Sequence, residues 1–276
     1  MPHTIRNEFD KHLTIKALLD AHERACKTKR YSREVLKFEI DLETNIVNLY
    51  KKLKNGTYKM GKYRTFKIYE PKERVIRALP YVDRIVHQWY IHEFIKPYVV
   101  PRFISDSYAC IEGKGTHKAV DKAQEYMQKM KNKYSTYYIV KCDIKGFFYN
   151  IDKDVLYNIL KKFIKDEKLL ALTYEFIYND GEDVGLPIGN YTSQFFANIY
   201  MNELDHYIKE RLKVKYYVRY MDDFIIRVDI ILIKWDLTFV DLEYMRAIDC
   251  LGKEVLKRLR EKLEDGICYM KEDFLI

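Results

Sequence analysis

Two adjacent acidic residues, Asp222 and Asp223, offer the clearest chemistry in the sequence. They stand between two apolar runs, residues 216–218 (YYV) and 224–226 (FII). The runs predict two short strands joined by a tight turn, with both carboxylates at the tip of a hairpin. Carboxylates between apolar strands need their charge compensated, and a divalent cation is the usual partner. A solvated turn is the alternative for this stretch taken alone, because Asp is common in turns.

A third acidic residue, Asp143, follows another apolar run at residues 137–140 (YYIV). A short continuous apolar run predicts a buried strand, which places Asp143 at the end of that strand. An acid in this position is a second candidate metal ligand. Asp152 and Asp154 are interpreted instead as caps of the helix that follows them.

A second hairpin is predicted over residues 61–84, turning near residues 70–72 (EPK). Its cations suit a triphosphate, because Arg can bind phosphate oxygens through two parallel hydrogen bonds. The candidates are Lys72, Arg74 and Arg77. A solvated hairpin with scattered charge is the alternative reading of this stretch alone.

Two glycine-containing turns precede predicted helices. Residues 113–116 (GKGT) include Lys114 and can present backbone N–H groups to a phosphate, although the spacing is not that of a Walker loop. Residues 185–190 (GLPIGN) lead into a helix that Thr192 and Ser193 are expected to cap. Glycine in such a loop allows the backbone to approach a substrate closely.

The 276-residue chain has a formal net charge of +8 and contains 25 Tyr and 14 Phe. This balance favours a polyanionic partner and base stacking, although many mildly basic enzymes bind no nucleic acid. The five cysteines form no CxxC pair and no zinc spacing with His, so we expect reduced thiols in a cytoplasmic protein. Neither a signal peptide nor a run of about 20 apolar residues is indicated, so no membrane partner is expected.

The N-terminal 60 residues are polar and show a helical pattern. Apolar positions predict one short helix around residues 13–19 and a second over residues 35–49 that ends near Gly56. His87 and His92 are interpreted as core or helix-surface residues rather than as ligands. No catalytic pattern is found in the first 60 residues.

The sequence resembles the reverse transcriptases. The shared features are a cationic hairpin, three acids at the ends of predicted strands and a glycine loop, arranged along the chain as in that family. The resemblance covers residues 66–226. YMDD at 220–223 is similar to the catalytic hairpin of that family, DIKGFF at 143–148 to its first metal-binding strand end, and DSYACIEGKGTH at 106–117 to its second fingers block. The implied fold is α+β, a right-hand polymerase with fingers and a ferredoxin-like palm. The implied domains are a helical extension (1–60), fingers (61–135) and palm (136–276), with a helical fingers insertion at about 153–184.

Within that family, the loop at 187–194 (PIGNYTSQ) resembles the bacterial diversity-generating retroelement enzymes, which are group II intron-like. Ile188 stands where most relatives have Gln. We therefore expect a low-fidelity RNA-directed DNA polymerase. The alternatives are an antiviral-defence, retron or group II intron-like reverse transcriptase, or a polymerase-fold nucleic-acid-binding protein that is inactive without a thumb.

The resemblance implies two Mg²⁺ ions, with Mn²⁺ as a substitute, held by the three aspartates and the backbone carbonyl of Ile144. It implies an RNA template, a DNA or RNA primer, dNTPs and a small basic accessory protein, in a bacterial or phage-encoded system. Phe148 is similar to the family's steric gate against a 2′ hydroxyl. The other implied nucleotide contacts are Lys72, Arg74, Arg77, Ile188, Gly189 and Gln194, and the implied template or primer contacts are Tyr220, Met221 and Lys114.

The resemblance fades after about residue 228. Residues 230–240 are unexpectedly apolar, a helix is predicted over residues 242–263, and residues 266–276 are interpreted as a last palm strand with Lys271 in place of the family's lysine. A thumb is expected to be absent or truncated. Truncation of the chain, an altered reading frame near residue 228, and a partner that supplies the missing grip are three alternatives that the sequence leaves open.

Overall fold

The computed structural model describes residues 4–71, 73–134 and 138–228, and the chain divides into two compact units. Unit 1 consists of Met1–Arg102 and Phe148–Ile199, and unit 2 of Phe103–Phe147 and Tyr200–Ile276. Helices are combined with two antiparallel sheets, which confirms the α+β class. The predicted elements at 230–240, 242–263 and 266–276, with Lys271, lie outside the described residues.

Unit 1 is built mainly from helices, together with one hairpin. Its elements are α1 (Phe9–His12), α2 (Ile15–Cys26), α3 (Arg33–Glu39), α4 (Leu42–Lys54), β1 (Arg64–Ile68), β2 (Arg74–Ala78), α5 (Tyr81–Tyr90) with a π-helical continuation (Ile91–Ile95), α6 (Lys96–Tyr98), a 3₁₀ turn (Val100–Arg102), α8 (Lys153–Phe163) and α9 (Glu167–Tyr178). Helix α10 (Tyr191–His206) begins in unit 1 and ends in unit 2.

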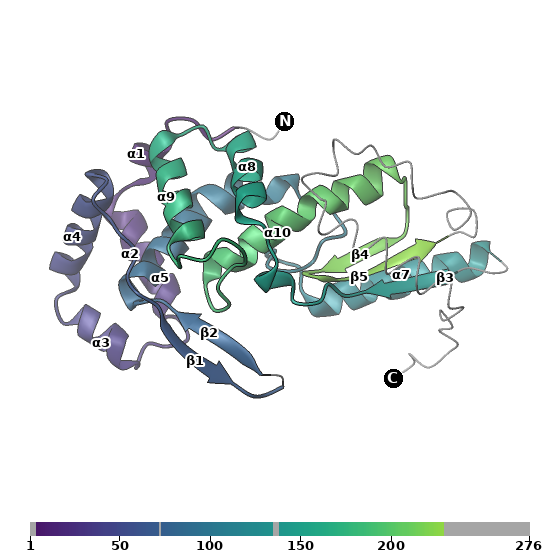
Figure 1. Ribbon diagram of the computed structural model, residues 1–276, viewed down its shortest axis with the longest axis horizontal. Helices are drawn as coiled ribbons and strands as arrows, with labels where there is room; N and C mark the ends of the chain where they lie inside the picture. The colour runs from purple at the N-terminus through teal and green to yellow at the C-terminus, as the bar shows by residue number, and fades with distance from the viewer. Residues whose placement is uncertain (1–3, 72, 135–137, 229–276) are drawn as a thin grey trace. The chain divides into compact units, whose positions relative to one another are not determined.

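Helices α2 and α5 pack against each other at the centre of unit 1 (Figure 1). Thr14 caps α2, because its hydroxyl accepts the N–H of Ala17 at 3.0 Å. The fully buried ring of Trp89 in α5 meets the ring of Phe9 edge-on at 5.4 Å. The N-terminal helices are therefore held on α5 by apolar burial.

One expectation for the N-terminal region was wrong. The predicted helix over residues 35–49 is two helices, α3 and α4, separated at Ile40 and Asp41. Asp is a poor residue for a helix interior because its side chain competes for backbone N–H groups. The break lets Phe38 and Ile46 both become buried, while Ile40 stays 86% exposed.

The predicted cationic hairpin is confirmed. Strands β1 and β2 pair antiparallel, from Arg64 opposite Ala78 to Ile68 opposite Arg74. Of the two expected caps of α8, Asp152 is confirmed, because it accepts the N–H of Val155 at 2.8 Å. Asp154 was wrong as a cap, since it lies inside the first turn and accepts the hydroxyl of Tyr178 at 2.5 Å instead.

Within the residues that the structure describes, unit 2 contains a three-stranded antiparallel sheet with a helix along it. Its elements are α7 (Thr116–Lys133), β3 (Tyr138–Cys142), a 3₁₀ turn (Phe147–Tyr149) that continues into unit 1, a π-helical turn (Tyr207–Arg211), β4 (Tyr217–Tyr220) and β5 (Asp223–Val228). The strand order is β3–β5–β4.

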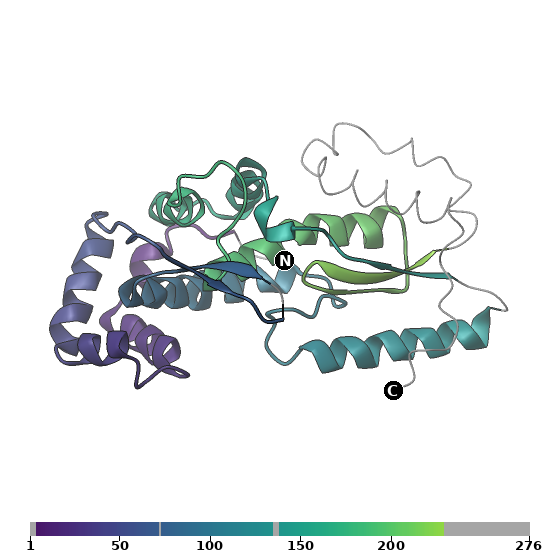
Figure 2. The ribbon, with the colours of Figure 1, turned by 60° about the horizontal axis from the view of Figure 1, so that its bottom comes forward.

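The two faces of this sheet are covered by different helices, as Figure 2 shows for α7 and the C-terminal part of α10. Val218 and Ile225 pack with Ala119 of α7 on one face. Alternation along β4 points Tyr217 to the other face, where its hydroxyl donates to Asp205 of α10 at 2.7 Å. No helix within the described residues is both long and apolar enough to cross a bilayer.

Candidate active site

The strand register brings three acidic residues to one end of the sheet in unit 2. Cys142 pairs with Phe224, so the next position places Asp143 opposite Asp223. Tyr220 pairs with Asp223 across the β4–β5 turn, which leaves Met221 and Asp222 as the two turn residues. Asp143 and Asp223 are exposed and Asp222 is half-buried. The predicted hairpin is confirmed, and the structure adds that the third acid lies beside it.

The turn that carries Asp222 has an unusual backbone. Met221 has a φ of 58°, in the left-handed region. A two-residue hairpin turn with φ above zero at its first position usually has Gly there. A non-glycine residue in this conformation costs free energy, so its surroundings must hold it in place.

The donor set at the sheet end fits a hard divalent cation. Carboxylate oxygens are the ligands that Mg²⁺ and Mn²⁺ accept in proteins. The carbonyl of Ile144, an expected further ligand, accepts the N–H of Phe147 at 3.2 Å and keeps a second lone pair. Residues Asp143, Asp222 and Asp223 could therefore hold such ions.

A different group among the described residues has the tight spacing of a single-ion site. Ligand atoms of His22, Cys26 and Glu39 all lie within 4.8 Å of one another. However, the ring nitrogens of His22 lie 2.8 Å from the hydroxyl of Tyr81 and 3.3 Å from Glu39, and Cys26 Sγ donates to the carbonyl of Glu23. We interpret this group as a buried hydrogen-bond network.

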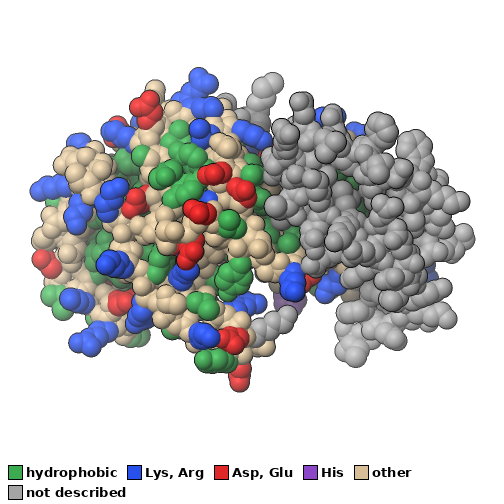
Figure 3. All heavy atoms as spheres, viewed as in Figure 1, with side chains coloured by type: hydrophobic (Ala, Val, Ile, Leu, Met, Phe, Trp, Pro, Cys, Tyr) green, Lys and Arg blue, Asp and Glu red, His purple; other side chains and the backbone are tan. Residues whose placement is uncertain are grey.

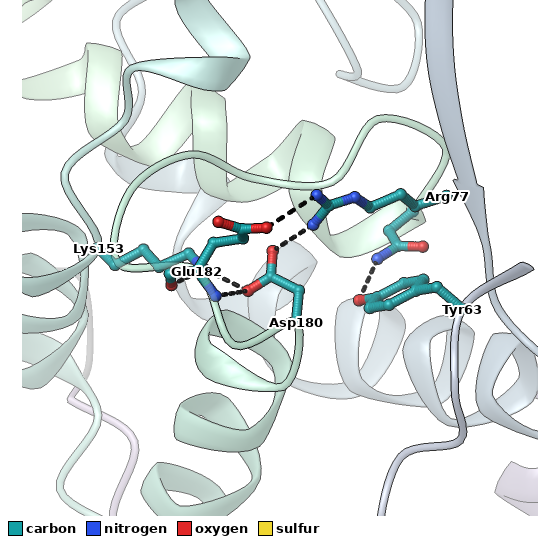
Figure 4. A network of polar contacts seen from close by, with 6 residues as sticks. Tyr63, Arg77, Lys153, Asp180 and Glu182 are labelled. Atoms are coloured by element: carbon teal, nitrogen blue, oxygen red, sulfur yellow. Dashed lines mark hydrogen bonds and ion pairs between the residues drawn. The ribbon is translucent and has the colours of Figure 1, made fainter. Parts of the chain in front are cut away.

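In unit 1, Arg77 lines a cavity of about 270 Å³ together with Val75, Tyr149 and the loop that includes Ile188. Its guanidinium is paired with acids that follow α9: Nη1 lies 3.2 Å from Asp180 and Nη2 3.3 Å from Glu182 (Figure 4). Asp180 also binds the buried ammonium of Lys153. The predicted phosphate-binding side chain therefore reaches a cavity, but acidic side chains already hold it.

The glycine loop lies directly on strand β2. The N–H of Arg77 donates to the carbonyl of Ile188 at 3.0 Å. Gly189 has a φ of 117°, and a Cβ there would lie 3.0 Å from Ile76 and 3.3 Å from the carbonyl of Arg77. Only glycine fits this close approach to strand β2. The close approach to a substrate that the sequence predicts for this loop stays a prediction. Asn190 donates to the hydroxyl of Tyr63 at 2.9 Å, which ties the loop to the chain before β1 (Figure 4).

The remaining nucleotide candidates have different surroundings. Arg74 and Gln194 are exposed, and Phe148 is half-buried with its carbonyl accepting the N–H of Leu186 at 2.7 Å. Lys72 lies outside the described residues.

The expected caps of α10 were wrong. The helix begins at Tyr191, so Thr192 and Ser193 lie inside its first turn. The hydroxyl of Thr192 lies 3.0 Å from Nδ1 of the buried His87.

Lys114, a predicted template or primer contact, binds its own unit. Its ammonium donates to the carbonyls of Ser105 and Ser107 at 2.6 and 2.9 Å and lies 5.0 Å from the ring centre of Tyr108. Burial lowers the pKa of Lys114. Tyr220, by contrast, is 39% exposed beside the acids. The structure therefore gives Lys114 a role in holding the loop that precedes α7.

A groove of about 570 Å³ also lies in unit 1. Basic and aromatic side chains line it, including Lys29, Arg33, Arg64, Phe66 and Tyr191. Elsewhere on the face of unit 1 in Figure 3, basic side chains are scattered with acidic ones among them. Net charge alone therefore does not identify a binding surface.

Two buried charged residues near the acids were missed at the sequence level. Arg219 and Asp205 are both completely buried and form an ion pair. A cation inside the apolar run YYVRY was the available signal, because a buried cation requires an acidic partner. The sequence does not say which acid supplies it.

Comparison with known protein families matches residues 59–232, more than half of the chain, to reverse transcriptase (RNA-dependent DNA polymerase). The chain is also similar to the group II intron-encoded protein LtrA of Lactococcus lactis subsp. cremoris, with 27% identity over 186 residues, covering 63% of this chain and 30% of that protein. Nuclear intron maturase 1, mitochondrial, of Arabidopsis thaliana is 27% identical over 119 residues, covering 43% of this chain and 15% of that protein. The chain spans less than a third of either relative.

Two solved structures show similar chains at low identity. One is a partial Cas6-RT-Cas1–Cas2 complex, with 19% identity, a TM-score of 0.45 and coverage of 79% of this chain and 38% of that chain. The other is telomerase from Candida albicans with a fragment of telomeric RNA, with 13% identity, a TM-score of 0.48 and coverage of 79% and 45%.

Proposed function

Because the chain belongs to the reverse transcriptase family, we propose that it synthesises DNA on an RNA template from deoxynucleoside triphosphates. The observation that carries this proposal is the strand register that brings Asp143, Asp222 and Asp223 to one end of the sheet. Phosphoryl transfer needs few covalent contributions from protein side chains. It needs an aligned hydroxyl, a held triphosphate and neutralised charge.

The three aspartates are proposed to hold two Mg²⁺ ions, with Mn²⁺ as a substitute. When bound, such ions lower the pKa of the primer 3′ hydroxyl and neutralise charge on the triphosphate. The side chains themselves contribute fixed negative charge at a sheet end, where two ordered strands limit their movement. Asp143 directly follows β3 and Asp222 lies in the β4–β5 turn, so two separate backbone segments set the spacing of the carboxylates.

Unit 1 is proposed to bind the nucleotide and the template. Arg77 would bind the triphosphate oxygens. Phe148 would pack beneath the sugar and exclude a 2′ hydroxyl by steric clash. Ile188 would make van der Waals contact with the base, without a hydrogen bond to it. The groove that contains Arg64 and Phe66 suits a single-stranded template, since cations bind phosphates and rings stack on bases.

The loop around Ile188 supports a more specific proposal, that the polymerase has low fidelity and belongs to a diversity-generating retroelement. An isoleucine cannot form the hydrogen bond that a Gln offers near the incoming nucleotide. Discrimination then depends more on shape than on polar contacts. A template and variable repeat pair beside the gene, together with a small basic accessory protein, would support this assignment over a defence role.

Primer extension on RNA in the presence of Mg²⁺ tests the proposed reaction. Asp143→Asn and Asp222→Asn keep the side-chain shape but remove charge, and each should lower the rate at least about 100-fold, because a metal-held charge contributes several kcal/mol to the transition state. Asp121→Asn changes an exposed acid on α7 in the same unit and should keep the wild-type rate. Wild-type rates in the two site variants would contradict the proposed site.

A further inference from the structure

A buried ion pair lies next to the turn that carries Asp222. The side chains of Arg219 in β4 and Asp205 in α10 have no exposed surface. Nε of Arg219 donates to one carboxylate oxygen at 2.7 Å, and Nη2 donates to the other at 2.6 Å. Two parallel hydrogen bonds of this kind fix the plane of the guanidinium as well as its position.

The third guanidinium nitrogen reaches the turn itself. Nη1 of Arg219 donates to the backbone carbonyl of Met221 at 2.8 Å. Met221 is the residue with the left-handed backbone, and its carbonyl belongs to the planar peptide that leads into Asp222. A hydrogen bond to that oxygen therefore fixes the orientation of the peptide from which the Asp222 side chain extends.

Further contacts keep Arg219 in place. Nη2 donates to the hydroxyl of Ser107 at 3.0 Å. The backbone of Arg219 forms two hydrogen bonds to the residues on either side of Ser107. Its N–H donates to the carbonyl of Asp106 and its carbonyl accepts the N–H of Tyr108, both at 3.0 Å. The hydroxyl of Tyr217 also donates to Asp205, at 2.7 Å, while both bonds from Arg219 to that carboxylate remain separate from it. Two side chains, Asp205 and Ser107, thus hold the guanidinium where it meets the turn.

Stability alone does not account for this arrangement. Replacing a buried ion pair by apolar side chains of similar volume is often neutral or stabilising. An apolar pair, however, could not donate a directional hydrogen bond to the carbonyl of Met221. The hydrogen bond to the Met221 carbonyl is therefore what a guanidinium at this position supplies and an apolar side chain could not.

We propose that Arg219 is a positioning residue for the metal-binding acids: anchored on Asp205, it holds the strained Met221–Asp222 peptide so that Asp222 is preorganised for a divalent cation. This role rests on the proposed function of the acids. Arg219 itself is assigned no contact with substrate or metal.

The test compares Arg219→Lys with Tyr217→Phe. Lys keeps a positive charge for Asp205 but offers one nitrogen where Arg offers three, so the bond to the Met221 carbonyl is lost. Tyr217→Phe is the matched control, because it removes a hydrogen bond to the same buried carboxylate and leaves the Met221 contact in place. Both variants are made in the full chain and checked for cooperative melting.

Three measurements follow. In Arg219→Lys, the backbone amides of residues 221–224 should exchange with deuterium about tenfold faster, and Mn²⁺ binding, measured by paramagnetic resonance, should weaken about tenfold or more, as for loss of an outer-shell partner. The turnover rate in primer extension should fall by a similar factor, while primer–template binding stays unchanged. Tyr217→Phe should retain wild-type values in all three.

Wild-type exchange and Mn²⁺ binding in a folded Arg219→Lys variant would overturn the proposal, as would equal losses in Tyr217→Phe. Should Arg219→Lys fail to fold, Ser107→Ala replaces it: faster turn exchange than in Tyr217→Phe supports the proposal, and equal exchange contradicts it. Deuterium exchange of the turn amides and Mn²⁺ binding can both be measured without any polymerisation. A wild-type chain that binds Mn²⁺ but never extends a primer would therefore contradict the proposed function and still leave the positioning role decided by these two readouts.

Discussion

Among single residues, the aspartates at the sheet end are proposed to act through charge, whereas Ile188 is proposed to act through shape. Ile188 is half-buried, and its carbonyl is fixed by the N–H of Arg77. Its backbone is therefore set independently of its side chain. A substitution at this position should change contacts to the nucleotide without moving the loop.

Ile188→Gln should narrow the misincorporation spectrum, because an amide can hydrogen-bond near the incoming nucleotide and penalise mispaired bases. Sequencing of cDNA copied from a defined RNA measures this effect. Ile188→Val, which keeps the side chain apolar, should retain the wild-type spectrum. An unchanged spectrum in Ile188→Gln would show that the residue only packs beneath the nucleotide.

The sequence predicted which acids form the candidate site, but it did not predict which side chains bind the residues around that site. Asp143, Asp222 and Asp223 could be found because acids beside apolar strands are conspicuous. The partnership of Arg219 with Asp205 could not, because it joins a strand to a helix through tertiary packing. The acids that hold Arg77 were missed for a related reason, since no local pattern brings Asp180 and Glu182 to strand β2.

At the scale of elements, the β1–β2 hairpin is joined to the segment after α9 by ion pairs from Arg77 to Asp180 and Glu182. Glu182→Gln removes one of the acidic partners of Arg77 at a site that is 59% exposed. The freed guanidinium should bind triphosphate more readily and lower the KM for dNTP. An exposed ion pair contributes at most about 1 kcal/mol, so the decrease should not exceed about fivefold.

Steady-state kinetics at varied dNTP concentration measures this change. Glu73→Gln is the control, because Glu73 pairs with Lys67 on the same hairpin and does not contact Arg77. A KM that stays constant or rises in Glu182→Gln would show that the acids do not compete with the triphosphate.

Helix α5 gives unit 1 a specific sensitivity to acid. Burial lowers the pKa of His87 to about 3, in a site formed by Met60, Thr192 and the ring of Phe176. A lowered folded-state pKa means that protonation favours the unfolded chain. The contribution of His87 to stability is therefore complete above its unfolded pKa of about 6.5 and is lost as the pH falls below that value.

Between about pH 7 and pH 5, this linkage should cost about 2 kcal/mol of unfolding free energy. Urea unfolding at the two pH values measures it. His87→Gln should lack this part of the pH dependence, whereas His117→Gln, at an exposed position, should retain it. Equal pH dependence in wild type and His87→Gln would contradict the assignment.

The elements themselves followed from the sequence where periodicity was strong. Both hairpins, the strand before Asp143 and the Asp152 cap of α8 were predicted correctly. The division between α3 and α4 was not, because apolar spacing continues across Ile40 and only the burial of Phe38 and Ile46 reveals the break. The start of α10 was missed because Thr192 and Ser193, frequent cap residues, are buried inside its first turn instead.

At the scale of the whole molecule, each unit carries a different part of the proposed reaction. Unit 2 holds the acids, and unit 1 holds Arg77, Ile188 and the basic, aromatic groove. The match to the reverse transcriptase family, at residues 59–232, includes parts of both units. RNA-templated DNA synthesis is therefore the activity on which the proposals for the two units depend.

The most direct measurement is extension by the full chain of a labelled DNA primer annealed to RNA, with dNTPs and Mg²⁺. Treating the products with alkali destroys the template and any incorporated ribonucleotides. An alkali-resistant product that reaches the end of the template with wild type, and is absent with Asp222→Asn, is the predicted result. If the wild-type chain adds no nucleotide with Mg²⁺ or Mn²⁺, the central claim is contradicted.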